Sequence, residues 1–173
     1  GKKIAFLSPH NGSNQLWEMN ADGSDKVCIS DIEGGIEGFT YSPDGEKVMY
    51  IKKVKSVETA PDRYSDLPKA TGRIVDELMY KHWDHWVSEI PHTFYATIKN
   101  GSLTNHVDLL EGEPYEAPLL PFGGIGDIAW SPDSKSIVYT SKKMTGKEYA
   151  ESTNSDLYLY SIDNKTTENI TMG

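Results

Sequence analysis

The sequence predicts an all-β protein built from repeated four-stranded antiparallel units, with one helical insertion. The first supporting observation is a Ser-Pro-Asp turn between two alternating apolar runs, which occurs at residues 39–51 and again at 128–140. The second is an Asp-Gly or Asn-type turn between strand-like runs, found at residues 16–30, 94–107 and 157–171. Both segments are typical of β-hairpins, because Pro sets φ, Asp caps the turn and Gly tolerates a positive φ.

The order of the two hairpins indicates how they combine. Each complete module places the Ser-Pro-Asp hairpin before the second hairpin, which makes four short antiparallel strands in succession. This is the strand plan of one blade of a β-propeller. An ordinary antiparallel sandwich uses similar turns, but it would not repeat both hairpins in the same order. The sequence therefore predicts a β-propeller fragment of about three four-stranded blades.

The blade boundaries follow from the repeats. The first blade covers residues 2–30 and lacks its leading strand, because residues 3–8 match only the strand that follows a Ser-Pro-Asp turn. The second blade covers residues 37–110 and the third covers 126–171. Propellers close with about 4–8 blades, so we interpret residues 1–173 as a partial propeller domain of a larger protein. Its open blade edges would favour self-association.

An insertion at residues 55–91 interrupts the second blade between its second and third strands. Within it, residues 72–87 carry apolar side chains at helical spacing, and Pro68 and Pro91 flank them. The apolar positions are 74, 75, 78, 79, 83, 86 and 87. We therefore predict an amphipathic helix with two tryptophans on one stripe, which needs a blade edge or a neighbouring domain as its partner surface.

Successive connections alternate between the two ends of the strands in an up-and-down blade, which predicts a functional face. The short Ser-Pro-Asp and Asp-Gly turns are expected at one end. The long connections are expected at the other: the insertion and residues 31–37, 111–126 and 142–155. Binding residues tend to lie on elaborated loops carried by a rigid scaffold. Surface insertion without a function is the alternative interpretation.

The composition excludes several kinds of partner and site. The 173 residues include 17 Lys+Arg and 26 Asp+Glu, a net charge of −9, so nucleic acid and anionic lipid would be repelled. No apolar run is long enough to span a bilayer. Cys28 is the only cysteine, which excludes an internal disulfide framework and a cysteine-rich zinc site.

The sequence contains no recognisable motif for catalysis, cofactors or metals. A nucleophile elbow needs G-x-S-x-G, and residues 123–126 lack the serine. The same glycines lack the G-K-[ST] ending of a phosphate-binding loop, so no cofactor is predicted. His82 and His85 would be neighbours on a helix, but the zincin pattern H-E-x-x-H is missing. We therefore expect both to lie on a solvated polar face and predict no metal site.

Residues 65–86 resemble a signature of the prolyl oligopeptidase family of serine peptidases, particularly its bacterial dipeptidyl-peptidase and acylaminoacyl-peptidase-like members. The stretch reads SDLPKATGRIVDELMYKHWDHW. The Ser-Pro-Asp modules resemble the N-terminal propeller of the same family. They are also similar to the propeller protein of the bacterial Tol envelope system.

The resemblance implies a parent serine peptidase in which an N-terminal propeller caps a C-terminal α/β-hydrolase domain with a Ser-Asp-His triad. The propeller would admit short peptides and help to hold them, and no catalytic residue would lie in this chain. A periplasmic or secreted location is implied as well, with a cytoplasmic one as the alternative. The alternative function is a non-enzymatic periplasmic propeller that serves as a protein-binding platform, like the Tol-system protein.

Three acidic residues of the insertion are candidates for substrate binding: Glu77, Asp84 and Glu89. An aminopeptidase-like enzyme must hold the free α-ammonium group of a peptide, and carboxylates do so through charge-assisted hydrogen bonds. Ordinary surface charge on a helix is the alternative interpretation for all three residues.

Overall fold

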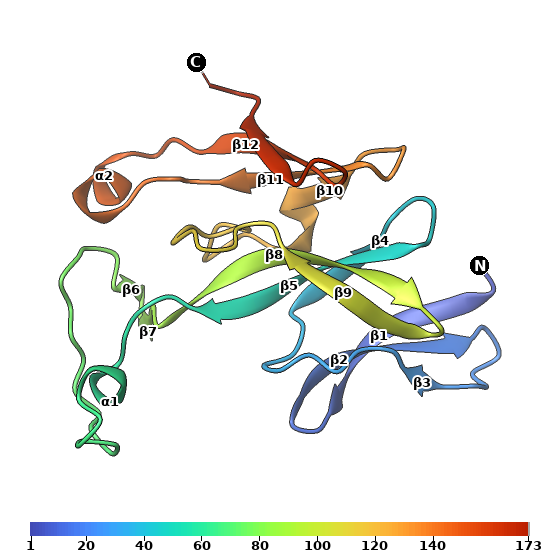
Figure 1. The fold of residues 1–173 in the computed structure, drawn as a ribbon, viewed down its shortest axis with the longest axis horizontal. Coiled ribbons are helices and arrows are strands. Elements are labelled where there is room, and N and C mark those ends of the chain that lie inside the picture. Colours follow the sequence, from blue (N-terminus) through green and yellow to red (C-terminus); the bar gives the residue numbers. More distant parts are fainter. Residues whose placement is uncertain (173) are drawn as a thin grey trace.

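The computed structural model describes residues 1–172, and most of them form antiparallel β-sheets (Figure 1). Gly173, the last residue of the predicted domain, lies outside the described residues. The first sheet has the order β1-β2-β3, formed by Lys3–His10, Ser13–Asn20 and Val27–Cys28. The second has the order β4-β5-β8-β9, formed by Gly38–Tyr41, Lys47–Lys55, Glu89–Lys99 and Ser102–Asp108. The third has the order β10-β11-β12-β13, formed by Ile128–Trp130, Ser136–Ser141, Asp156–Ser161 and Thr166–Asn169.

These sheets have the up-and-down strand order of β-propeller blades, as the repeats predict. The number of blades in the whole protein and the residue limits of each blade remain predictions. Among residues 1–172, no helix is both long and apolar enough to cross a membrane.

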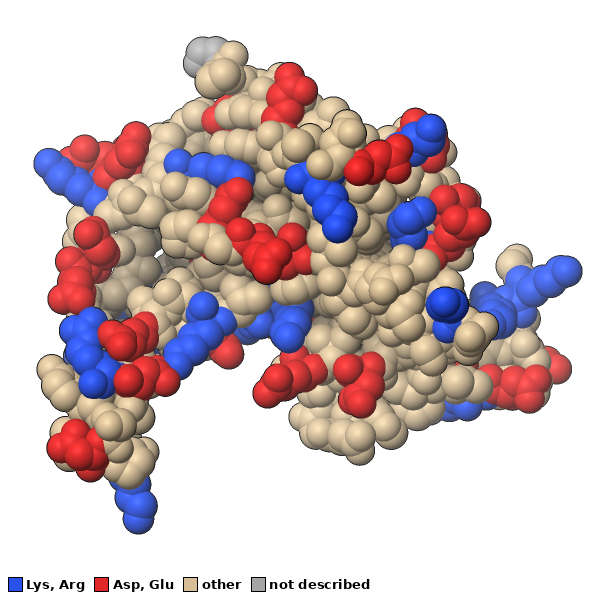
Figure 2. All heavy atoms as spheres, in the orientation of Figure 1, with Lys and Arg blue, Asp and Glu red and all other residues tan. Residues whose placement is uncertain are grey.

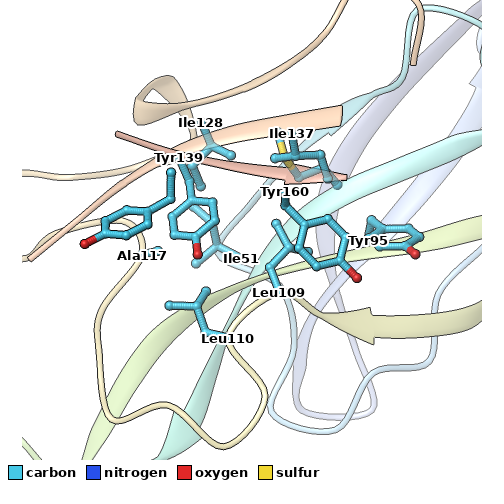
Figure 3. Close-up of a cluster of buried hydrophobic side chains, with 11 residues drawn as sticks. Ile51, Tyr95, Leu109, Leu110, Ala117, Ile128, Ile137, Tyr139 and Tyr160 are labelled. Atoms are coloured by element: carbon cyan, nitrogen blue, oxygen red, sulfur yellow. The ribbon is translucent and has the colours of Figure 1, made fainter. Parts of the chain in front are cut away.

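Two hydrophobic clusters join the three sheets, and strand β5 contributes to both. Met49 and Ile51 belong to the cluster shared with the third sheet, whereas Val48 and Tyr50 belong to the cluster shared with the first. This alternation follows from the two-residue period of a strand, which sends successive side chains to opposite faces. Figure 3 shows the first of these clusters, in which Tyr139 and other side chains of the third sheet pack over Leu109 and Leu110. The second sheet is therefore covered on both faces.

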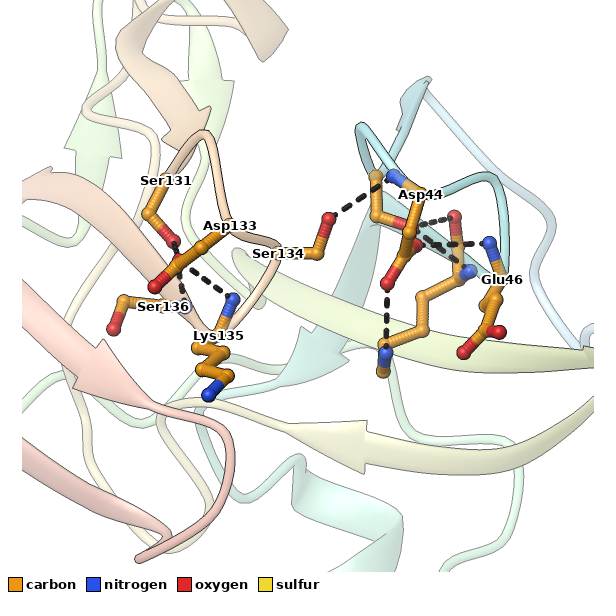
Figure 4. A network of polar contacts seen from close by, with 9 residues as sticks. Asp44, Glu46, Ser131, Asp133, Ser134, Lys135 and Ser136 are labelled. Carbon is orange, nitrogen blue, oxygen red and sulfur yellow. Dashed lines mark hydrogen bonds and ion pairs between the residues drawn. The ribbon is translucent and has the colours of Figure 1, made fainter.

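The two Ser-Pro-Asp turns have the same hydrogen-bond network (Figure 4). Ser42 donates its hydroxyl to Asp44 Oδ1 at 2.6 Å, and Ser131 donates to Asp133 Oδ1 at the same distance. The hydrogen bond from the serine hydroxyl is the main reason that the pKa of each aspartate lies below its usual value. The turns also touch each other, because the Asp44 backbone N–H donates to Ser134 Oγ at 3.1 Å. The sequence prediction of an Asp-capped turn is confirmed at both places.

Figure 1 shows the Ser-Pro-Asp turns and the Asp-Gly or Asn-type turns at the opposite end of the sheets from the long connections, as predicted. The predicted short turns are residues 21–26, 43–46, 100–101, 132–135 and 162–165. The long connections are residues 31–37, 56–88, 109–127 and 142–155, and the two-residue turn between β1 and β2, residues 11–12, lies at the same end beside residues 31–37.

The insertion differs from the sequence prediction, because residues 72–87 form no helix. Instead, Lys81–His82 (β6) and His85–Trp86 (β7) pair as a short hairpin, with Trp83 at a φ of 52° in its turn. The helix that the insertion does contain is the single turn α1, Ala60–Arg63. An amphipathic helix is stabilised mainly by burial of its apolar stripe. Here several members of the stripe stay exposed, on a segment that projects from the body of the molecule (Figure 2).

Candidate functional site

A cavity of about 270 Å³ lies where three long connections meet. Its wall is formed by residues 73–80, 82, 86 and 87 of the insertion, residues 114–116 between β9 and β10, and residues 144–146 and 149 between β11 and β12. Two of the last residues, Gly146 and Tyr149, belong to helix α2, Gly146–Glu151. The face at which the sequence predicts the long connections is thus also the face that carries this cavity.

Much of the cavity wall is apolar. Ile74, Leu78, Met79 and Val87 contribute aliphatic side chains from the insertion, and Ile90 contributes one from the start of β8. Such a wall favours apolar groups of a ligand over polar ones, because it removes them from water without requiring new hydrogen bonds.

One buried carboxylate, that of Glu116, interrupts the apolar wall. Glu116 is 6% exposed, and its Oε1 lies 2.9 Å from Nε2 of His82 on strand β6. Its Oε2 accepts a hydrogen bond from the Leu120 backbone N–H at 3.2 Å. A buried carboxylate is costly unless it has such partners. The contact between His82 and Glu116 therefore anchors the β6–β7 hairpin to the β9–β10 connection.

Tyr149 of helix α2 completes the polar part of the wall. Burial raises the pKa of its hydroxyl to about 12, and the negative charge of the neighbouring Glu116 adds to the effect. The tyrosine is therefore neutral at neutral pH and can donate a hydrogen bond. Lys142 supports the helix, because its Nζ donates to the Tyr149 carbonyl at 2.5 Å and to the Ser152 carbonyl. A cation near the last carbonyls of a helix is favourable.

Two positively charged side chains lie over the ring of Trp86 on strand β7. The Arg73 guanidinium lies 4.5 Å and the Lys81 ammonium 4.4 Å from the centre of its ring. Tyr80 packs against the same ring, with 6.0 Å between ring centres. These cation–π contacts hold the exposed indole in a defined position.

The structure places the three predicted acidic residues in different surroundings. Glu77 lines the cavity, and its carboxylate lies against Gly146 at the start of α2, where a Cβ atom would clash with it. Asp84 lies in the exposed turn of the β6–β7 hairpin, with its Oδ1 at 3.3 Å from His85 Nε2. Glu89 is the exposed first residue of β8 and does not line the cavity. Binding of an ammonium group by any of the three stays a prediction.

The buried pair of His82 and Glu116 was not predicted from the sequence. The expectation of a solvated face holds for His85, but it is wrong for His82, whose imidazole contacts a buried carboxylate. The two partners are 34 residues apart, and no local pattern links them. The apolar residues around Glu116 were the available signal that this stretch of loop is buried. Within residues 1–172, no cluster of three or more His, Cys, Asp or Glu side chains is placed to bind a metal.

Comparison with known proteins shows a clear likeness in sequence. No protein-family model matches the chain. Over its full length, the chain is 53% identical to dipeptidyl-peptidase 5 of Porphyromonas gingivalis, of which it covers 25%. The chain thus spans about a quarter of the length of the curated relatives that it matches.

The fold is also shared with solved propeller structures. The acylaminoacyl peptidase of Pyrococcus horikoshii matches with a TM-score of 0.60 at 12% identity, over 98% of this chain and 23% of that chain. A TolB structure from Agrobacterium tumefaciens matches with a TM-score of 0.50 at 13% identity, over 98% of this chain and 45% of that chain. Such low identities show the fold alone. We conclude that the chain is a β-propeller region related to the corresponding quarter of the dipeptidyl-peptidase 5 proteins.

Proposed function

We propose that the chain is the non-catalytic propeller of a dipeptidyl-peptidase-like serine exopeptidase of the prolyl oligopeptidase family. In this proposal it gates and helps to bind short peptides for an α/β-hydrolase domain outside these residues. The observation that carries the proposal is the full-length identity of 53% with dipeptidyl-peptidase 5 of P. gingivalis. That relative is about four times as long as this chain, so a separate catalytic domain fits within its length.

The size and position of the cavity support a role with short peptides. Ligand pockets usually enclose about 300–1,000 Å³, and this cavity, with about 270 Å³, lies just below that range. It suits one or two residues of an extended peptide rather than a folded protein. Segments of three connections line it.

The charges around the cavity indicate how a peptide would be oriented. Of the three acidic candidates, Glu77 is the one that lines the cavity. We therefore assign to Glu77 the binding of the α-ammonium group of the peptide. The apolar wall would then receive the adjacent side chain. Both carboxylate oxygens of Glu116 already have partners, His82 and the Leu120 backbone N–H. We therefore assign Glu116 a structural role in the cavity wall rather than a role in binding the peptide.

The proposal includes a periplasmic or secreted location, which rests on the family resemblance of residues 65–86. The alternative of a protein-binding platform like that of the Tol system has less support. The likeness to TolB shows the fold alone, whereas the likeness to dipeptidyl-peptidase 5 extends to half of the residues.

The test uses the whole parent protein, treated with a fluorophosphonate probe and digested for mass spectrometry. We expect one labelled serine outside residues 1–173 and hydrolysis of dipeptidyl substrates with a free N-terminus. Glu77→Gln should raise KM by about tenfold with kcat nearly unchanged, because a charge-assisted hydrogen bond to bound substrate is lost. Asp84→Asn is the matched control and should behave as the wild type. An unlabelled parent protein, or a labelled serine within residues 1–173, would contradict the proposal.

A further inference from the structure

The carboxylate of Glu77 lines the cavity without a polar partner of its own. Glu77 is exposed and lies in the irregular part of the insertion, between α1 and β6. The neighbouring Asp76 is paired, since its Oδ2 lies 3.7 Å from Arg63 Nη2. Among residues 1–172, no hydrogen bond or ion pair includes the Glu77 carboxylate. A long side chain of this kind can adopt several rotamers, and it would lose that freedom on binding a ligand.

Gly146 of helix α2 limits the positions that this carboxylate can take. The three atoms nearest to a Cβ built at Gly146 all belong to the Glu77 carboxyl group: Oε2, Cδ at 3.4 Å and Oε1 at 4.0 Å. The approach to Oε2 is closer than unbonded atoms allow, so the carboxylate in its present place and a side chain at position 146 exclude each other. The carboxylate therefore rests on the backbone of a residue that has no side chain.

The surface that Gly146 presents is a fixed one, because α2 is held from outside the helix. Lys142 Nζ donates to the carbonyls of Tyr149 and Ser152. Glu77, in contrast, belongs to a segment without secondary structure. Where the two compete for space, the end of a flexible side chain yields more easily than a held backbone. A larger residue at position 146 is therefore expected to displace the carboxylate rather than α2.

We propose that Gly146 is a positioning residue, which sets the place of the Glu77 carboxylate and so determines how well the cavity binds the α-ammonium group of a peptide. This inference rests on the proposed function of Glu77. A charge-assisted hydrogen bond to a carboxylate spans about 2.7–2.9 Å between heavy atoms. A carboxylate displaced by about 1 Å no longer meets the ammonium group of a peptide whose other contacts are unchanged.

The test is a double-mutant cycle in the whole parent protein, with a fluorogenic dipeptidyl amide that has a free N-terminus. Gly146→Ala should raise KM by about tenfold and leave kcat nearly unchanged, which is the change expected of Glu77→Gln. In the combined variant, Gly146→Ala should add less than about twofold, because the charged group that it displaces is already gone.

Gly112→Ala is the matched control for backbone strain. Gly112 has a φ of 79° and Gly146 one of 55°, so alanine is strained at both positions, but a Cβ at Gly112 would meet open space. Gly112→Ala should keep the KM of its background with either residue at position 77. The two alanine variants should also lose similar unfolding free energy. A much larger loss in Gly146→Ala would show that α2 moves instead of the carboxylate, which would overturn the proposal.

The outcomes separate this inference from the proposed function. If Glu77→Gln leaves KM unchanged, the role of Glu77 and the role of Gly146 both fail. If Glu77→Gln raises KM but Gly146→Ala does not, the role of Gly146 alone fails. An equal rise of KM from Gly146→Ala in both backgrounds would show that the new side chain obstructs the peptide directly, and this result would also overturn the inference.

Discussion

The carboxylate of Glu116 shows at the scale of single residues how the cavity wall is held. It lies in a loop, yet it is buried and has partners on two other elements, His82 of β6 and Tyr149 of α2. In a low-dielectric site, each of these contacts is stronger than the same contact in water, and loss of one partner leaves a charge exposed to the apolar wall. The carboxylate thus links both elements to the β9–β10 connection.

The raised pKa of Tyr149 predicts a loss of stability at high pH. The unfolded tyrosine ionises near its ordinary pKa of 10.0, whereas the folded one ionises at about 12. Its contribution is complete below pH 10 and is lost as the pH rises through this window, because the unfolded state releases its proton first. We expect Tyr149→Phe to lose less stability than the wild type between pH 10 and 12. The difference should be about 1 kcal/mol, since Tyr149 is only half-buried and solvent screens the effect.

Denaturant unfolding at a series of alkaline pH values measures this difference. Tyr64→Phe is the matched control, because Tyr64 lies exposed on the insertion and does not line the cavity. Identical pH dependence in the two variants would show that Tyr149 does not contribute as predicted.

At the scale of elements, the turns show how a residue can compensate for a strained backbone. Gly45 has a φ of 73° in the first Ser-Pro-Asp turn, and Ser134 takes the equivalent position in the second with a φ of 61°. A left-handed conformation is unfavourable for serine. The Ser134 hydroxyl, however, accepts a hydrogen bond from the Asp44 N–H, which links the second and third sheets. We infer that this contact offsets part of the strain.

The connection between β3 and β4 gives a prediction about packing. Gly34 and Gly35 both have a positive φ, but a Cβ at Gly35 would lie 2.8 Å from the Asn14 carbonyl oxygen, whereas one at Gly34 would meet open space. Gly34→Ala should therefore cost about 1 kcal/mol of unfolding free energy from backbone strain alone. Gly35→Ala should cost about 3 kcal/mol or more, because the chain must move away from β2. Denaturant unfolding of both variants tests this, and equal losses would contradict the packing argument.

At the scale of the whole molecule, the outer sheets leave apolar side chains without a neighbouring blade. Ile4 and Val27 are exposed on the first sheet, Leu157 is exposed on the third, and Ile170 directly follows β13. We predict that the chain of 173 residues, expressed alone, associates in a concentration-dependent way through these surfaces. Leu157→Lys combined with Ile170→Lys should weaken the association.

Analytical ultracentrifugation over a range of concentrations measures this association. Val57→Lys combined with Leu67→Lys is the control, because both residues lie on the insertion and not on an outer sheet. A monomer at every concentration, or equal weakening by the control pair, would contradict the assignment of the contact to the outer sheets.

The sequence by itself determined the repeated hairpins, the opposite placement of short turns and long connections, and the absence of a nucleophile elbow. These features are local: a Ser-Pro-Asp turn closes through its own side chains, and two-residue alternation decides which face of a strand is buried. Only the tertiary structure decided that residues 72–87 form a hairpin rather than a helix, and that Glu116 meets His82 and Tyr149. An apolar stripe at helical spacing forms a helix when a surface covers it, and contacts between residues 34 apart depend on how separate connections fold together.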